Sequence, residues 1–253
     1  MNMTTLVDRI LKWLPDMPDH RDRPFSLVAP DSLPKFIDPI DKNNQIEDQG
    51  RIGSCTGNSS TTALEIALKT KLQYSRLMAY YNGRLIEGTT TTDAGAYIRD
   101  VIKGIQKYGV AEETLWPYVP GNFATKPSAA AYTDAKKVIP LVKSYERLST
   151  LDNVKTALAA GLPVVFGFSV PEYFMNTGVA ETGWVRLPTL SDKIIGGHAV
   201  CAVGYDERVG EPFIWVRNSW GRTWGLNGDF KMPYGWFTSP NRIVDDMWVM
   251  HPH

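Results

Sequence analysis

The stretch GGHAVCAVGY, residues 196–205, decides the fold. Its apolar run follows two glycines and ends at Gly204, which predicts a buried strand over His198–Tyr205. Strand-like runs precede and follow it, at Pro163–Val170, Glu211–Arg217 and Asp229–Met232. The second half of the chain is therefore predicted to be mostly β.

The first half of the chain has the three- and four-residue apolar spacing of helices. We predict helices from Ser54 to about Leu72, over Leu77–Leu85, over Ala94–Tyr108 and over Asp152–Ala160. Helices followed by strands indicate an α+β protein whose two halves meet at a cleft. A chain of 253 residues is long enough for two such lobes.

Residues 1–32 differ in character from the rest. Apolar residues from Leu6 to Leu14, including Trp13, allow a short amphipathic helix, and a mixture of proline and charge follows. This extension is either a loose tail or a segment that covers the cleft. We expect the body to occupy residues 33–253, with a helical lobe over about 45–145 and a β lobe over about 146–253.

Charge and hydropathy exclude several classes of function. Lys+Arg and Asp+Glu both number 27 and no basic run occurs, so we expect no nucleic-acid partner. No apolar stretch approaches a membrane span, so we expect no membrane partner either. Charged residues interrupt the N-terminal apolar run, which predicts a cytoplasmic protein or one exported without a recognisable signal peptide.

The chain has two cysteines, Cys55 and Cys201. Cys55 follows a glycine-rich loop and opens a predicted helix, where the helix dipole favours a nucleophilic thiolate. Cys201 is three residues after His198 on a strand, so the two side chains face opposite sides of the sheet. We therefore expect Cys201 to be a small buried side chain, with no metal site and no cofactor.

A nucleophilic thiol needs a base, and the base needs an orienting acceptor. Of the four histidines, His198 is the one in the body of the chain away from its ends. Asn218, in the run Val216–Gly221, can accept a hydrogen bond from the imidazole, and Trp220 can shield that bond from water. Each of these residues alone would be read as structural.

Together the three segments resemble the papain family of cysteine peptidases. QGRIGSC (residues 49–55) looks like its nucleophile loop, residues 196–205 like its histidine strand, and NSWGRTWGLNGDF (residues 218–230) like its asparagine turn. The resemblance extends from about Leu33 to the C-terminus. It implies a helical left lobe and a β-barrel-like right lobe with the active-site cleft between them.

The resemblance also implies an activity and its residues. We expect a cysteine endopeptidase that cleaves peptide or protein substrates through a thioester acyl-enzyme. Cys55, His198 and Asn218 would form the triad, and Gln49 would donate to the oxyanion. Substrate contacts would come from Gly95, Ala96, Gly197, Ala199, Trp224 and Asp245.

The sequence departs from the family at several points. Thr56 stands where an aromatic residue usually follows the nucleophile, and the cysteines of the usual disulfides are absent. These departures indicate a divergent, bacterial branch. Residues 1–32 are too few for the long helical propeptide of the family, so we expect at most a short pro-segment that inhibits intramolecularly.

Two alternatives remain at this point. The same triad could transfer the acyl group to an amine, which would make the protein an acyltransferase or isopeptidase. A non-catalytic, papain-shaped binding module is a different class, and such a protein should have lost a triad residue.

Overall fold

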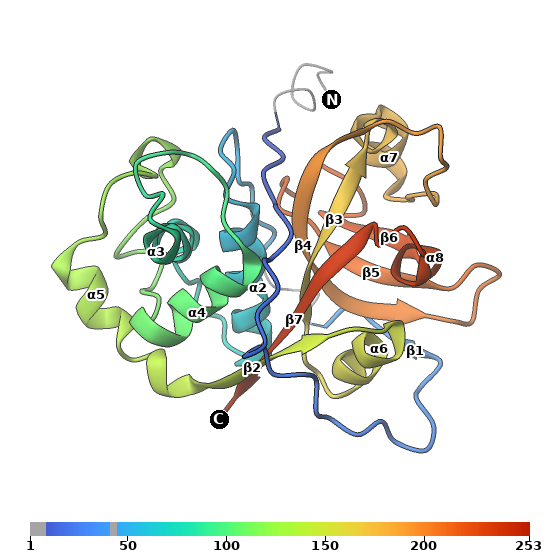
Figure 1. Cartoon of the computed structure of the whole chain (residues 1–253), viewed down its shortest axis with the longest axis horizontal. Coiled ribbons are helices and arrows are strands. Elements are labelled where there is room, and N and C mark those ends of the chain that lie inside the picture. Colours follow the sequence, from blue (N-terminus) through green and yellow to red (C-terminus); the bar gives the residue numbers. More distant parts are fainter. Residues whose placement is uncertain (1–8, 41–44) are drawn as a thin grey trace.

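Two lobes of different secondary structure face each other across the N-terminal segment of the chain (Figure 1). The computed structural model describes residues 9–40 and 45–253. One lobe contains four helices: α2 (Cys55–Ala67), α3 (Arg76–Glu87), α4 (Ile98–Tyr108) and α5 (Ala129–Ala135). The other contains most of the sheet and the helices α6 (Leu151–Ala159), α7 (Thr177–Thr182) and α8 (Gly235–Thr238). The predicted order of helices before strands is confirmed.

One antiparallel sheet holds the second lobe together. Its strands follow the order β2-β7-β3-β4-β5-β6, and the short β1 (Phe36–Ile37) pairs with β4. Their bounds are β2 Val142–Leu148, β3 Val164–Pro171, β4 Ile194–Asp206, β5 Phe213–Arg217, β6 Asp229–Pro233 and β7 Val244–Pro252. This path is open: among the described strands no pairing joins β6 to β2. The right lobe is thus a strongly paired open sheet rather than a closed barrel.

Helix α2 lies at the junction of the lobes. All of its residues are buried, because α3 and α4 cover it on one side and β4 and β7 on the other. A helix that is buried on every face is a core element. Its N-terminus, residue 55, therefore points into the seam between the lobes, next to β4.

The helices and strands fall close to their predicted positions, with shifts at the ends. Helix α2 ends at Ala67 rather than near Leu72, and α4 begins at Ile98 rather than Ala94. Helices α5, α7 and α8 and strands β1, β2 and β7 were not predicted. Helix α5 is a short, alanine-rich element, and β2 (VKSYERL) alternates polar and apolar residues only weakly.

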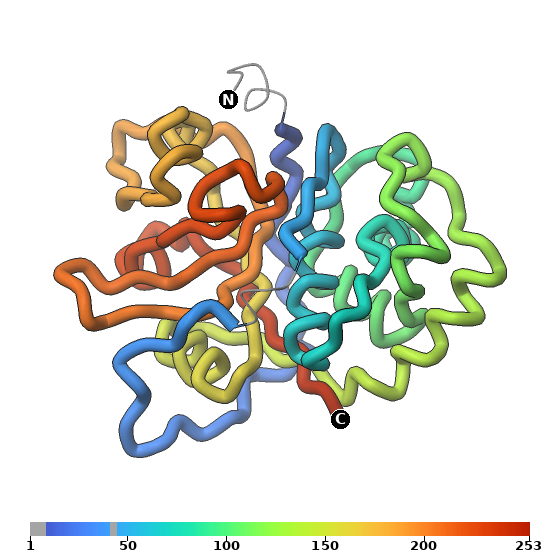
Figure 2. The backbone as a smooth tube through the Cα atoms, turned by 180° about the vertical axis from the view of Figure 1, so that it is seen from behind, coloured from blue at the N-terminus to red at the C-terminus, as the bar shows by residue number. Residues whose placement is uncertain are grey.

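The expected amphipathic helix of the extension is wrong for the described residues. Residues 9–17 contain no helix, and Lys12 forms a parallel bridge with Gly197 of β4. Leu6, where that helix would begin, lies outside the described residues. The extended segment runs along the junction of the two lobes and then passes around the β lobe (Figure 2). Pairing with β4 supplies the backbone hydrogen bonds that a helix would have made internally.

None of the helices within residues 9–40 and 45–253 combines the length and the apolar character needed to cross a bilayer.

The contact between α3 and α4 depends on a missing side chain. A Cβ atom at Gly83 would lie 2.6 Å from Cγ2 of Val101, closer than packed carbon atoms approach. We expect Gly83→Ala to lower the free energy of unfolding by about 1–3 kcal/mol through overpacking, less any gain in helix propensity. The matched control is Gly178→Ala in α7, where nothing lies within 4 Å of the new methyl group. Urea denaturation of both variants tests this, and equal midpoints would contradict it.

Candidate active site

Cys55 is the first residue of α2 and is fully buried. Backbone groups of Ala199, the residue after His198, and of Lys12 in the extension lie near the thiol and favour its ionised form. Burial outweighs them and raises the pKa of the thiol to about 11. The thiol is also free, as is that of Cys201. In this covered state Cys55 is therefore protonated at neutral pH.

His198 and Asn218 are joined by a buried hydrogen bond. His198 Nε2 lies 2.8 Å from Asn218 Oδ1, and the same oxygen accepts the backbone N–H of Ser219 at 2.8 Å. The second contact orients the amide so that its oxygen faces the ring. Nδ1 of His198 is buried, and no described group hydrogen-bonds to it. Burial lowers the pKa of His198 to about 4, with a smaller contribution from the charge of Arg9.

Aromatic rings surround this pair. Trp220 stacks on His198 with ring centroids 5.0 Å apart, and Phe168 of β3 meets it edge-on at 5.8 Å. Both rings exclude water from the hydrogen bond to Asn218. Trp224, expected to line the cleft, is 1% exposed and packs edge-on against Trp220. While the extension is docked, Trp220 contacts His198, and Trp224 packs against Trp220.

Gln49 is held beside the nucleophile loop. Its Oε1 accepts the hydroxyl hydrogen bond of Ser219 at 2.7 Å, and its Nε2 donates to the carbonyl of Ile52 at 3.1 Å. The backbone N–H of Gln49 also bonds to the carbonyl of Ser219. A side-chain amide has two N–H groups, so one donor remains beyond the bond to Ile52.

The predicted substrate-contact residues on the two sides of the cleft now contact the extension. Gly95 has a φ of +82°, and a Cβ atom there would overlap the carbonyl oxygen of Lys12. A Cβ atom at Gly197 would overlap the backbone carbonyl oxygen of Trp13. The backbone N–H of Trp13 donates to the Gly197 carbonyl at 3.0 Å. Ala96 and Ala199 are both buried.

The sequence analysis missed the residue that accepts the side chain of Trp13. A Cβ atom at Gly167 of β3 would overlap the indole, which is only 5% exposed. A glycine inside an apolar strand signals close approach by another group, so this signal was present in the sequence. The sequence did not indicate that the approaching group would be the indole of Trp13.

Asp245 and Asp246 follow the start of β7. Asp245 forms ion pairs with Arg147 (3.3 Å) and Arg242 (3.0 Å), so its charge is already balanced. Asp246 is buried, bonds to Arg147 at 2.7 Å and accepts the backbone N–H of Asp16 at 2.6 Å. In the covered state neither carboxylate is available to a basic substrate side chain.

No group of three His, Cys, Asp or Glu side chains within the described ranges is arranged to hold a metal ion.

Comparison with known proteins identifies the family of this chain. Residues 33–240 match the model of the papain family cysteine proteases. An uncharacterized peptidase C1-like protein of Acanthamoeba polyphaga mimivirus is 40% identical over 98% of this chain and 88% of its own length. Bovine (Bos taurus) pro-cathepsin H is 32% identical, and the alignment covers 79% of this chain but 57% of that protein.

The fold matches solved structures of the same class. Xylellain, a cysteine protease from Xylella fastidiosa, superposes with a TM-score of 0.87 at 36% identity, over 96% of both chains. The proform of cathepsin B from Trypanosoma congolense shares the fold, with a TM-score of 0.74 at 18% identity, over all of this chain and 89% of that one. The chain therefore belongs to the papain family of cysteine proteases and is a cysteine-type peptidase.

Proposed function

We propose that Cys55, His198 and Asn218 form the catalytic triad of an endopeptidase that works through a thioester intermediate. The observation that carries this is the contact of the Cys55 thiol with the backbone of Ala199, next to a histidine that is hydrogen-bonded to Asn218. Nucleophile, base and orienting amide thus lie on three segments that meet at one point. Covalent catalysis by a thiol needs these three parts: a nucleophile, a base that activates it and a group that orients the base.

The chemistry follows in two halves. The Cys55 thiolate attacks the substrate carbonyl carbon, and the oxyanion accepts hydrogen bonds from the Gln49 amide and the Cys55 backbone N–H. His198 then gives its proton to the leaving amine as the C–N bond breaks, which leaves a thioester on Cys55. Water, deprotonated by His198, attacks the thioester and releases the acid and the thiol.

The two buried cysteines allow a matched test of the nucleophile. We expect Cys55→Ala to lose peptide hydrolysis by a factor of roughly 10³ or more, because no other side chain can form the thioester. Cys201→Ala, the control, should keep hydrolysis within about a few-fold. Fluorogenic peptide assays and intact-mass detection of an alkylated thiol measure both. Retained hydrolysis in Cys55→Ala would contradict the proposal.

We further infer that residues 9–32 inhibit this site in cis. Lys12 lies against the nucleophile, and its side chain pairs with Asp93. Trp13 fills the space over Gly167 and Gly197. A peptide substrate needs the same glycine backbones and the same thiol, so it cannot bind while this segment is in place.

The direction of the segment explains why it would not be cleaved. Arg9 bonds to the carbonyl of Trp220, whose ring stacks on His198, and Trp13 lies beyond Lys12, over Gly167 of β3 and Gly197 of β4. His198 protonates the leaving amine, so the C-terminal part of a substrate belongs on the histidine side. The extension has its N-terminal part there and therefore runs opposite to a substrate.

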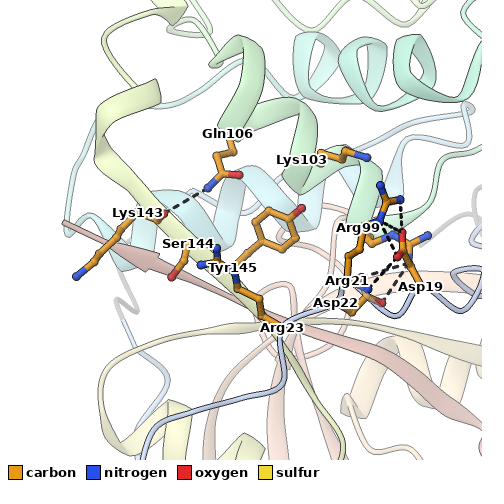
Figure 3. A pocket seen from close by; sticks show the side chains of 10 residues that line it. All are labelled: Asp19, Arg21, Asp22, Arg23, Arg99, Lys103, Gln106, Lys143, Ser144 and Tyr145. Atoms are coloured by element: carbon orange, nitrogen blue, oxygen red, sulfur yellow. Dashed lines mark hydrogen bonds and ion pairs between the residues drawn. The ribbon is translucent and has the colours of Figure 1, made fainter.

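Beyond Trp13 the extension is held by charged contacts. Asp16 accepts the indole N–H of Trp248 at 2.8 Å, and Asp22 pairs with Arg99 of α4 at 3.1 Å. Residues 19 and 21–23 line a pocket of about 260 Å³ together with residues of α4 and β2 (Figure 3). The segment is thus tied to both lobes.

The burial of Trp13 sets the strength of this inhibition. Removing a buried indole costs about 3 kcal/mol or more, enough to raise the open population by roughly 100-fold. We expect Trp13→Ala in the full chain to raise kcat/KM for peptides and the rate of Cys55 alkylation by at least roughly tenfold. Leu14→Ala is the control, because Leu14 is 54% exposed and its removal should change neither rate. Unchanged rates in Trp13→Ala would contradict inhibition by this segment.

The buried carboxylates give the inhibition a pH dependence. Burial, together with the charge of Asp246, raises the pKa of Asp16 to about 7. A raised pKa means that the docked segment holds a proton that the released segment loses. Docking is therefore favoured in acid and weakened as the pH rises to about 7. Arg99 and Arg147 oppose this effect, and Trp248 donates to the ionised form.

We expect peptidase activity of the full chain to increase as the pH rises from about 4 to about 7, and to level off above that, by more than the titration of the active site explains. Asp16→Asn should remove that additional increase, since the amide cannot ionise. The paired measurement is kcat/KM against pH for both proteins, with Asp152→Asn as an exposed control. Parallel profiles for the three proteins would contradict this.

A further inference from the structure

One end of the cleft carries a binding site for a cation, which Arg9 fills in the covered state. Its guanidinium forms an ion pair with Asp48. It also donates to the carbonyl oxygens of Trp220 at 3.3 Å and Gly50 at 3.4 Å. Its Cζ lies 5.8 Å from the Trp220 ring centroid, and the Arg9 side chain is only 12% exposed.

The groups around this guanidinium are suited to one chemistry. They are a carboxylate, two backbone carbonyls and an aromatic ring, all of which attract a cation and none of which donates a hydrogen bond to it. An acidic side chain would be repelled, and an apolar one would leave the carboxylate without its partner. Arginine fits best because its planar fork can contact several acceptors, and lysine fits as a point charge.

The site belongs to the body of the protein and does not depend on the extension for its shape. Gly50 N–H bonds to the Asp48 carboxylate at 2.9 Å, and Asp48 forms an antiparallel bridge with Trp220. Arg76, a second cation whose charge lowers the pKa of Asp48, is committed to Glu47 at 2.6 Å and Glu113 at 3.0 Å. When the extension leaves, the acceptors remain in place around an unfilled position.

The position of the site relates it to substrate. Asp48 immediately precedes Gln49, and Trp220 stacks on His198, so the site borders the side on which the leaving amine departs. We propose that Asp48, with the carbonyls of Gly50 and Trp220, is a substrate subsite for an arginine or lysine side chain on the leaving-group side of the scissile bond. This rests on the proposed peptidase function and names its substrate class: polypeptide segments that are basic just after the cleaved bond. Arg9 occupies the subsite as a substitute for that side chain.

The test uses full-length Arg9→Ala, in which the subsite is vacated without removal of any segment. Fluorogenic peptides share one acyl-side sequence and carry Arg, Lys, Gln or Glu at each of the three positions after the cleaved bond. We expect kcat/KM for the best Arg peptide to exceed that of its Gln counterpart by roughly tenfold, and the Glu peptide to be poorest. The preference should shrink as salt is added, because half-exposed charges are screened.

Asp48→Asn in the Arg9→Ala background should reduce the Arg-to-Gln ratio to about one while the Gln peptide is still cleaved. Arg9→Ala/Asp93→Asn is the matched control, since Asp93 also pairs with a cation of the extension, but with Lys12 rather than with Arg9. That control should keep the ratio. Equal cleavage of Arg and Gln peptides by Arg9→Ala would overturn the subsite and leave the peptidase function intact.

A binding measurement separates the two proposals if hydrolysis itself fails. Fluorescence anisotropy of labelled Arg and Gln peptides with Arg9→Ala/Trp13→Ala/Cys55→Ala, in which the extension no longer covers the cleft, reports the subsite without any chemistry. Tighter binding of the Arg peptide, abolished by Asp48→Asn, supports the subsite even where no cleavage occurs. Equal affinities in this protein would overturn it.

Discussion

The packing of the N-terminus of α2 against β4 is the contact on which the rest of this structure depends. It places Cys55 beside Ala199, one residue from His198, although the two segments are far apart in the sequence. Helix α3 supports α2 closely from the other side, because a Cβ atom at Gly57 would lie 2.7 Å from the carbonyl oxygen of Arg76. Everything else in the site, from the Asn218 hydrogen bond to the aromatic rings, orients groups around this junction.

Burial of the site by the extension changes its chemistry as well as its access. Solvent or nearby charges stabilise the ionised forms of Cys55 and His198. In the covered site both groups are removed from solvent, which favours their neutral forms. The pKa of Cys55 is raised and that of His198 lowered, so both groups are neutral at physiological pH. Uncovering the cleft thus both admits substrate and permits the reactive ion pair.

Much of this arrangement could be predicted from the sequence, because the relevant signals are local. The glycines around Cys55, the apolar run after His198 and the turn at Asn218 identify their elements and the family. The path of residues 9–17 could not be predicted, since its conformation is determined by partners on β4 and β3 that are distant in sequence. The ion pair of Asp245 with Arg147 of β2 was likewise not predicted, because the two residues are distant in the sequence, and the substrate contact expected of Asp245 stays a prediction.

The glycine beneath the indole has a consequence for how this protein can change over generations. Trp13 lies where any side chain at position 167 would project. A substitution at Gly167 would therefore narrow the groove and displace the segment that we propose inhibits the site, producing an enzyme with altered selectivity and weaker inhibition. A compensating smaller residue at position 13 would restore restraint. Substitutions at positions 13 and 167 are therefore expected to occur together rather than singly.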